Sequence, residues 1–503
     1  MSRGTTDRPQ SPALGADNRL WRVFARNVRD NVMAESATQI VRVATMVLLA
    51  RRLDPHEFGV FRVLLMVSVV IGLVNQAGIP EALIQSPDLR TEHESTAWWI
   101  TVELSLMTAG VLYESAPLAA RLMAMPALVP GMRLLCLPLI IEGFVATAEA
   151  RLQRELRFGL LAFASILSEA AFLGTALWVL HAGYPARSLP AGLAARFAVH
   201  GLTIWIAAGR TARQMPRLSA ARDFTRFAST AMGSQIVCFL SSNADYLLVG
   251  RLLGGAALGY YSIAWDLLRF VPDRLYQVAG RVTFPTFCRL RDDDRRFGQA
   301  YLKFFRYIAK IVLPLVTCLI VAAPEVLTAV YGAKWAAAAT PLRLLGSGLA
   351  PAGLTVGIGS VYYAKNRPGL DLYLHSARLM LLTIACVGFA PFGLRGVSAA
   401  MGVEEALIGM AGCWLVTRLI GVSMRDLVRA GAPGLALAIA CGVATLVGKG
   451  AAAALEIQGL AAFALIAALP SAVFLWSEAS NVIEMIRDAF GAISGASSDS
   501  VVG

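Results

Sequence analysis

The stretch NADYLLVGRLLGGAALGYY, residues 243–261, decides how the rest of the chain is organised. It begins inside an apolar segment that contains an acid, Asp245, turns at Gly254 and Gly255, and continues into a second apolar segment. Glycine adopts the positive φ angles of tight turns without steric cost, so the pattern predicts two long helices joined by a short turn. An acid in a membrane helix is costly, so it usually faces a cavity or a partner.

A second copy of this pattern lies 200 residues earlier. The stretch LLARRLDPHEFGVF, residues 48–61, aligns without a gap on LVGRLLGGAALGYY, residues 248–261, and places Gly59 on Gly259. Apolar helices can match by chance, but the shared positions favour two related halves. Because six predicted helices separate the copies, both halves should cross the membrane in the same direction, related by an axis along the membrane normal.

The composition indicates a membrane protein. Of 503 residues, 57% are hydrophobic and 16% charged, whereas about a quarter of a typical soluble protein is charged. The mean hydropathy is +0.61. The seven cysteines show no CxxC or other paired spacing, so we expect no zinc site and no disulfide framework. The sequence also shows no catalytic constellation, and we expect no metal and no cofactor.

Apolar segments of membrane-spanning length recur along the chain, about fourteen in all, and they include 308–330, 338–362 and 433–449. The predicted fold class is therefore an all-α polytopic membrane protein with two pseudo-symmetric six-helix bundles and two C-terminal helices. The predicted division is 1–30 as a cytoplasmic N-terminal segment, 31–209 as the first bundle, 210–227 as a basic cytoplasmic linker, 228–420 as the second bundle, 433–476 as the two extra helices, and 477–503 as a cytoplasmic tail.

Basic residues are unevenly distributed among the predicted loops. Residues 210–226 hold five arginines, whereas the loop at 51–52 holds two. Along the whole chain, alternate loops differ roughly two- to threefold in Arg and Lys, and the richer loops are cytoplasmic by the positive-inside rule. This distribution accounts for the net charge of +12 without a nucleic-acid partner. It places both termini in the cytoplasm.

Arginines in the predicted helices are candidates for binding an anionic substrate, because guanidinium groups bind phosphate oxygens through two hydrogen bonds. A charge at the centre of a membrane helix costs ~3 kcal/mol on insertion scales, so a lone lipid-facing position does not fit most of them. Two structural explanations stay open: pairing inside the bundle, and snorkelling from a helix end. The candidates are Arg42, Arg269, Arg274, Arg343 and Arg378, of which Arg274 and Arg343 best fit snorkelling.

Acids in the predicted helices are candidates for coupling or gating. Asp266 stands three residues before Arg269, so an ion pair within one helix is an alternative to a functional role. Arg378 follows Asp371 and His375 at helical spacing, which indicates one polar stripe. The candidate acids are Glu103, Glu169, Asp245 and Asp266.

Several motifs, in order along residues 20–420, resemble the MOP superfamily (multidrug/oligosaccharidyl-lipid/polysaccharide exporters), and within it the lipopolysaccharide and exopolysaccharide biosynthesis transporters, the Wzx-like polysaccharide flippases. The motifs are LLARRLDPHEFGVFRV from residue 48, LQRELRFGLLAF from 152, NADYLLVGRLLGGAALGYYSIAW from 243, RVTFPTFCRL from 281 and VLTAVYGAKWAAAATPLRLL from 326. The sequence departs from the family pattern at HAGYPARSLPAG, residues 181–192, where the family more often has a GfGvWALV-like turn.

The resemblance implies two bundles around a central cavity in the bacterial inner membrane, and alternating access. It implies a flippase, not an enzyme, that carries a polyprenyl-pyrophosphate-linked oligosaccharide from the cytoplasmic to the periplasmic leaflet for surface polysaccharide assembly. The arginines would bind the pyrophosphate. The expected partners are the lipid-linked substrate and the bilayer. A coupling cation, a polysaccharide polymerase and glycosyltransferases are further partners that this role allows.

Two other functions stay open. A cation-coupled drug or metabolite antiporter of the same superfamily would favour a cavity of acids and aromatic residues, whereas this chain has more arginines. A membrane-embedded polysaccharide polymerase or glycosyltransferase normally needs a large periplasmic loop with catalytic residues, and the predicted periplasmic loops here are short.

The loop charges predict the topology. Reporter fusions after Ser219 and after Arg296 should report a cytoplasmic location, and a fusion near Ala333 a periplasmic one, because the first two positions lie in arginine-rich loops. Alkaline phosphatase and green fluorescent protein fusions measure this directly. A periplasmic result for the first two positions would show that the number of helices before them is wrong.

Overall fold

Helices account for almost all of the described chain, and no strand occurs there. This confirms the predicted all-helical class. The predicted segment 1–30, the linker 210–227 and nearly all of the tail 477–503 lie outside the described residues. The computed structural model describes residues 38–76, 83, 91–155, 157–208, 239–240, 242–355, 357–457, 459, 461–475 and 477.

Six helical segments of the described chain are long and apolar enough to cross a membrane. The predicted total of about fourteen membrane spans stays a prediction. The six segments are Leu128–Arg154, Phe158–His181, Pro185–Ala208, Asp294–Val321, Gly369–Ile420 and Met424–Ala454.

The chain forms two compact units, and the predicted division into bundles at 31–209 and 228–420 stays a prediction. Unit 1 contains the described parts of residues 1–49, 64–120 and 126–236. Unit 2 contains residues 50–63, 121–125 and the described part of 237–503. Residues 50–63 therefore pack with the C-terminal half of the chain although they come early in the sequence.

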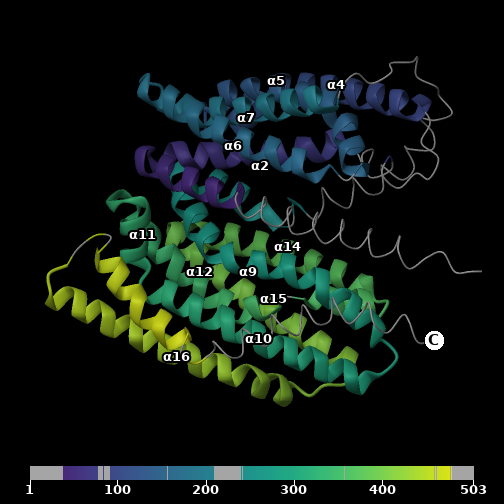
Figure 1. Cartoon of the computed structure of the whole chain (residues 1–503). Helices are drawn as coiled ribbons and strands as arrows, with labels where there is room; N and C mark the ends of the chain where they lie inside the picture. Colours follow the sequence, from purple (N-terminus) through teal and green to yellow (C-terminus); the bar gives the residue numbers. More distant parts are fainter. Residues whose placement is uncertain are drawn as a thin grey trace, which may run out of the picture. The chain divides into compact units, whose positions relative to one another are not determined.

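Unit 1 is held together by close helix contacts at small residues. At Gly192 on α7, an added Cβ would lie 2.9 Å from the carbonyl oxygen of Phe172 on α6, and these two helices lie side by side (Figure 1). Such approaches are typical of membrane helices, where packing replaces the hydrophobic effect. The named helices of this unit are the later part of α2 (Pro55–Gln76), α4 (Thr91–Met123, to residue 120), α5 (Leu128–Arg154), α6 (Phe158–His181) and α7 (Pro185–Ala208).

Unit 2 contains broken helices where the sequence predicts continuous ones. The predicted span 338–362 is two helices, because the chain turns at Gly357 with a φ of +88° that favours glycine. The predicted span 308–330 is also divided, and Pro324 starts the second piece. The elements are α9 (Gly255–Arg289), α10 (Asp294–Val321), α11 (Ala323–Tyr331), η1 (Ala333–Ala338), α12 (Ala339–Ala352), η2 (Gly353–Thr355), α13 (Ile358–Ala364), α14 (Pro368–Phe389), η3 (Ala390–Phe392), α15 (Gly393–Ile420) and α16 (Met424–Ala454).

Helix α16 begins nine residues before the predicted span that starts at 433. Ser423 caps it by accepting a hydrogen bond from the backbone N–H of Asp426 at 3.1 Å. The first turns of α16 are polar, so a hydropathy profile does not show that the helix begins there. The helix packs along α10 (Figure 1), where an added Cβ at Gly434 would lie 2.5 Å from the Ala309 carbonyl carbon. It therefore forms part of the packed body of unit 2.

The two copies of the repeat contact each other within unit 2. A methyl group at Gly59 would overlap the carbonyl oxygen of Gly255, and one at Gly259 would overlap the carbonyl oxygen of Pro55. Since residues 55 and 59 align with 255 and 259 at the 200-residue shift, the contact is reciprocal. A self-complementary contact of this kind is what a two-fold relation produces, and only glycine allows the backbones to approach so closely.

Aromatic packing fixes the same segment. The buried Trp335 donates a hydrogen bond from its indole Nε1 to the carbonyl oxygen of Ala50 at 2.8 Å. Its ring meets those of Phe58 and Tyr260 at centroid distances of 5.5 and 5.8 Å. Arg51 donates to the Val330 carbonyl at 2.7 Å. Residues 50–58 are thereby anchored on α9, α11 and η1.

Gly259→Ala tests the reciprocal contact. The added methyl group must separate two backbones, so we expect a loss of roughly 1–3 kcal/mol of stability, as for overpacked cores. Thermal unfolding of the purified protein in detergent, followed by tryptophan fluorescence, measures the change.

Gly110→Ala is the matched control, because nothing lies within 4 Å of its added Cβ on α4. Alanine there should be neutral or slightly stabilising. If both variants unfold at the wild-type temperature, the backbones of the two copies do not touch in the protein.

Candidate functional site

A buried carboxylate joins two arginines in unit 1. Glu169 on α6 is 1% exposed, and its Oε1 lies 2.9 Å from Nη2 of Arg42 and 3.2 Å from Nη2 of Arg196 on α7. Arg42 also donates from Nε to the same oxygen at 3.0 Å. Both guanidinium groups are only partly covered, with 35% and 29% of their side chains exposed. The cluster therefore offers two arginines whose outer edges stay accessible.

Further polar groups surround this pair of arginines. Glu142 on α5 acts electrostatically on Arg196, and an added Cβ on Gly72 would lie 3.7 Å from its Oε1. One turn further along α7, His200 approaches Glu149 at 3.6 Å. The polar face of unit 1 thus extends over α5, α6 and α7.

A second cluster lies in unit 2 around Glu405 on α15. Glu405 is 4% exposed and pairs with two arginines, Arg378 on α14 and Arg269 on α9. The Arg269 contact is 3.2 Å long, and the same guanidinium lies 4.5 Å from the centroid of the Trp265 ring. The arrangement of charges is the same as in unit 1, where one buried glutamate pairs with two arginines from other helices.

Asp266 does not pair with Arg269, so the ion pair considered within that helix is wrong. Asp266 instead accepts from Arg62 on α2 at 3.0 Å and from the hydroxyl of Tyr246 at 3.4 Å. The Arg62 guanidinium also stacks 4.2 Å from the Tyr246 ring centroid. The physical reason is the neighbouring helix: α15 supplies Glu405 to Arg269, and α2 supplies Arg62 to Asp266.

Asp245 is 2% exposed in the helical residues 242–253. Its Oδ2 accepts a hydrogen bond from the hydroxyl of Tyr261 on α9 at 2.9 Å. Its Oδ1 has no hydrogen-bond partner among the described residues. The acid in the stretch 243–261 therefore faces a protein interior, as its cost in lipid requires.

The other candidates lie outside these clusters. Arg343 on α12 is exposed and donates to the Ile320 carbonyl at 3.2 Å. Arg274 is partly buried on α9, and Glu103 is exposed on α4. Asp371 and His375 lie 3.9 Å apart on the same helix as Arg378. The structure thus brings Arg42 and Glu169 together in one unit and groups Arg269, Arg378 and Asp245 in the other.

Sequence reasoning missed several members of both clusters. Glu404 and Glu405 stand together in the apolar run AAMGVEEALIGM, residues 399–410, and charges inside an apolar run mark a candidate site. Arg196 in LAARFAVHG could have been found by the same criterion. Their partners come from distant positions in the chain, so the pairs themselves were not readable from the sequence.

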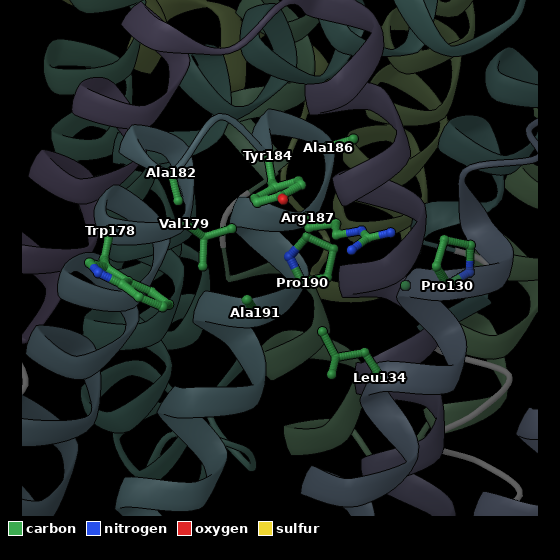
Figure 2. Close-up of a pocket in the computed structure, with 11 residues that line it drawn as sticks. Pro130, Leu134, Trp178, Val179, Ala182, Tyr184, Ala186, Arg187, Pro190 and Ala191 are labelled. Atoms are coloured by element: carbon green, nitrogen blue, oxygen red, sulfur yellow. The ribbon is translucent and has the colours of Figure 1, made fainter.

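One cavity of about 420 Å³ opens between α5, α6 and α7 of unit 1 (Figure 2). It lies at residues 181–192, where the sequence departs from the family pattern. Trp178, Val179 and Leu134 make it apolar, and Arg187 and Tyr184 are its polar side chains. None of the five candidate arginines lines it. Among the described residues, no group of three His, Cys, Asp or Glu could hold a metal ion.

The geometry defines a class of protein: a multi-pass helical membrane protein with charged clusters inside its helix bundles. The model of the family described as "Polysaccharide biosynthesis protein" matches residues 48–340, more than half of the 503 residues. The chain belongs to this family. The match confirms the resemblance to polysaccharide biosynthesis proteins seen in the motifs.

Curated relatives agree. The chain is 25% identical over 404 residues to "Teichuronic acid biosynthesis protein TuaB" of Bacillus subtilis (strain 168), with 76% of this chain and 80% of that protein covered. It is 29% identical over 332 residues to "Succinoglycan biosynthesis transport protein ExoT" of Rhizobium meliloti (strain 1021), with 64% and 66% covered. A solved structure of the lipid II flippase MurJ in an inward closed conformation has a TM-score of 0.70 at 14% identity, with 91% of this chain and 99% of that chain covered. This likeness shows the fold.

Glu169→Gln tests whether the carboxylate is the centre of the unit 1 cluster. The change keeps the shape of the side chain and removes its charge, so two arginines lose their counter-ion. We expect a loss of stability below the roughly 3–5 kcal/mol found for a fully buried pair, because solvent screens the partly exposed arginines. Thermal unfolding in detergent measures it.

Glu155→Gln is the control for this change. Glu155 lies between Arg151 and Arg157 at 3.8 Å from each, but is 47% exposed. Its loss should alter stability by no more than about 0.5 kcal/mol. Equal effects of the two variants would contradict a structural role for the buried carboxylate.

Proposed function

We propose that the protein is a flippase that moves a polyprenyl-pyrophosphate-linked oligosaccharide from the cytoplasmic to the periplasmic leaflet for surface polysaccharide assembly. The observation that carries the proposal is the pair of clusters, each with two arginines on one buried glutamate. Its relatives are named for polysaccharide biosynthesis and transport, and the fold is that of a lipid II flippase. Both support a lipid-linked glycan as cargo.

The arginine clusters suit a pyrophosphate. A phosphate oxygen can take the place of a carboxylate oxygen on a guanidinium, because both accept two parallel N–H bonds. In unit 1 the accessible edges of Arg42 and Arg196 would receive the phosphate while Glu169 keeps the two side chains oriented. In unit 2 Arg269 and Arg378 would bind the phosphate in the same way, while Glu405 keeps their side chains oriented. The charged clusters would then handle the head of the substrate while its lipid tail stays in the bilayer.

The same fold is used by a multidrug transporter of the MOP superfamily, so a cation-coupled antiporter is the alternative. The cationic substrate of such an antiporter would need accessible acids that no arginine holds. Glu169 and Glu405 each already hold two arginines, and Asp245 and Glu404 are buried. Coupling to a cation gradient, a cytoplasmic location of both termini, and contacts with a polymerase or glycosyltransferases are further parts of the proposal. Fusion reporters and co-purification test them separately.

Arg42→Ala is the test of substrate binding. The variant should abolish export of the surface polysaccharide at normal protein abundance, because it removes an accessible guanidinium. Arg42→Lys should restore export only in part, since an ammonium group cannot form the two-pronged contact. Complementation of a flippase-deletion strain measures export, and an immunoblot measures abundance.

Arg418→Ala is the matched control. Arg418 lies in the last turn of α15 and stacks 5.5 Å from the centroid of Trp414, outside both clusters, so export should stay normal. Full export by Arg42→Ala would remove Arg42 from the site. Loss of the variant protein from the membrane would instead favour a structural role for the ion pair with Glu169, which would hold the bundle together.

A further inference from the structure

In the described part of unit 2, one cluster of side chains contains one more buried carboxylate than its arginines can balance. Five ionisable side chains from four helices meet there. Glu405 takes both guanidinium groups, and the nearest cationic atom to Glu404 is Nε of Arg378, 4.0 Å from its Oε1. Neither oxygen of Glu404 has a hydrogen-bond partner among the described residues. The five side chains are Asp245, Arg269, Arg378, Glu404 and Glu405.

The three carboxyl groups of the cluster are buried, and the cluster would carry a net charge if fully ionised. Asp245, Glu404 and Glu405 are 2%, 3% and 4% exposed. Three carboxylates against the two guanidinium groups of Arg269 and Arg378 leave a charge of −1. An unpaired charge in a low-dielectric interior costs several kcal/mol. One bound proton removes that cost without moving any helix.

The contacts select the carboxyl group that holds the proton. Glu405 is fixed as an anion by Arg269 and Arg378. Asp245 accepts a hydrogen bond from the Tyr261 hydroxyl at 2.9 Å, which favours the anionic form of Asp245.

Glu404 has no such bond, and the groups that face it from other helices include the carboxylate of Asp245 and the thiol of Cys386. Of the three carboxyl groups, Glu404 is the one that makes no hydrogen bond among the described residues, so its surroundings favour the neutral acid.

We propose that Glu404 is a proton-binding site of unit 2, occupied in this state, and that exchange of its proton is part of the transport cycle. The proposal rests on the transport function inferred above. Glu404 lies beside the two arginines of unit 2 that would bind phosphate. Any movement of Arg378 toward or away from Glu405 changes the charge that Glu404 experiences, so a bound anion and a bound proton affect each other through one guanidinium.

Infrared spectroscopy tests the proton directly and needs no substrate. The purified full-length protein in lipid nanodiscs should show the carbonyl stretch of a protonated carboxylic acid at neutral pH, shifted in D₂O. Glu404→Gln should remove that band, while Asp245→Asn should leave it. A band that survives in Glu404→Gln, or that disappears in Asp245→Asn instead, overturns the assignment.

Two further measurements, of thermal unfolding and of polysaccharide export, complete the experiment. Because glutamine resembles the neutral acid, Glu404→Gln should unfold at the wild-type temperature, whereas Glu405→Gln should unfold at a lower one. In the flippase-deletion strain, Glu404→Gln should lose most polysaccharide export at normal abundance. Normal export by a variant that lacks the infrared band would show a static proton and overturn the role in transport. Failure of the wild-type chain itself to restore export would instead reject the proposed function and leave the proton assignment intact.

Discussion

Charge pairing inside helix bundles is the constraint on which this structure depends. An isolated ion away from water costs several kcal/mol even after local relaxation, so the charged residues of the bundles gather where partners exist. Glu169 in unit 1 and Glu405 in unit 2 each accept two guanidinium groups from other helices. A buried ion pair is weak evidence for extra stability, but it fixes which helices can be neighbours, because an incorrect arrangement leaves a charge without a partner.

The same constraint bears on the proposed binding of a phosphate by the arginine clusters. An arginine that must be paired in the resting protein is already oriented and already partly dehydrated. Binding of a phosphate to the outer edge of such a guanidinium would then require little reorganisation, which is the advantage of a preorganised site. Glu169 is almost completely buried and holds the inner edge of Arg42, whereas part of the Arg42 side chain stays exposed.

Much of the fold was predictable from the sequence because hydropathy and motif order are local properties. The helical class, the hairpin at residues 243–261 and the family were all predictable. The divided spans near Gly357 and Pro324 were not, since apolar runs on both sides of a break look continuous. The charged candidates were found one by one, but their partners were not. Arg62 and Asp266 are separated by 204 positions, and no periodicity connects residues so far apart.

The reciprocal contact between the two copies of the repeat has an evolutionary consequence. Pro55 meets Gly259, and Gly59 meets Gly255, within one folded unit. A half-length ancestor with a single copy would have formed the same contact by pairing with another molecule of itself, so the contact has the form expected of a fused homodimer. After fusion the two copies are no longer free to diverge independently. A bulkier residue at one of these glycines must be matched by a change in the other copy, and a gene that recombines its two halves with those of a distant relative would break the fit.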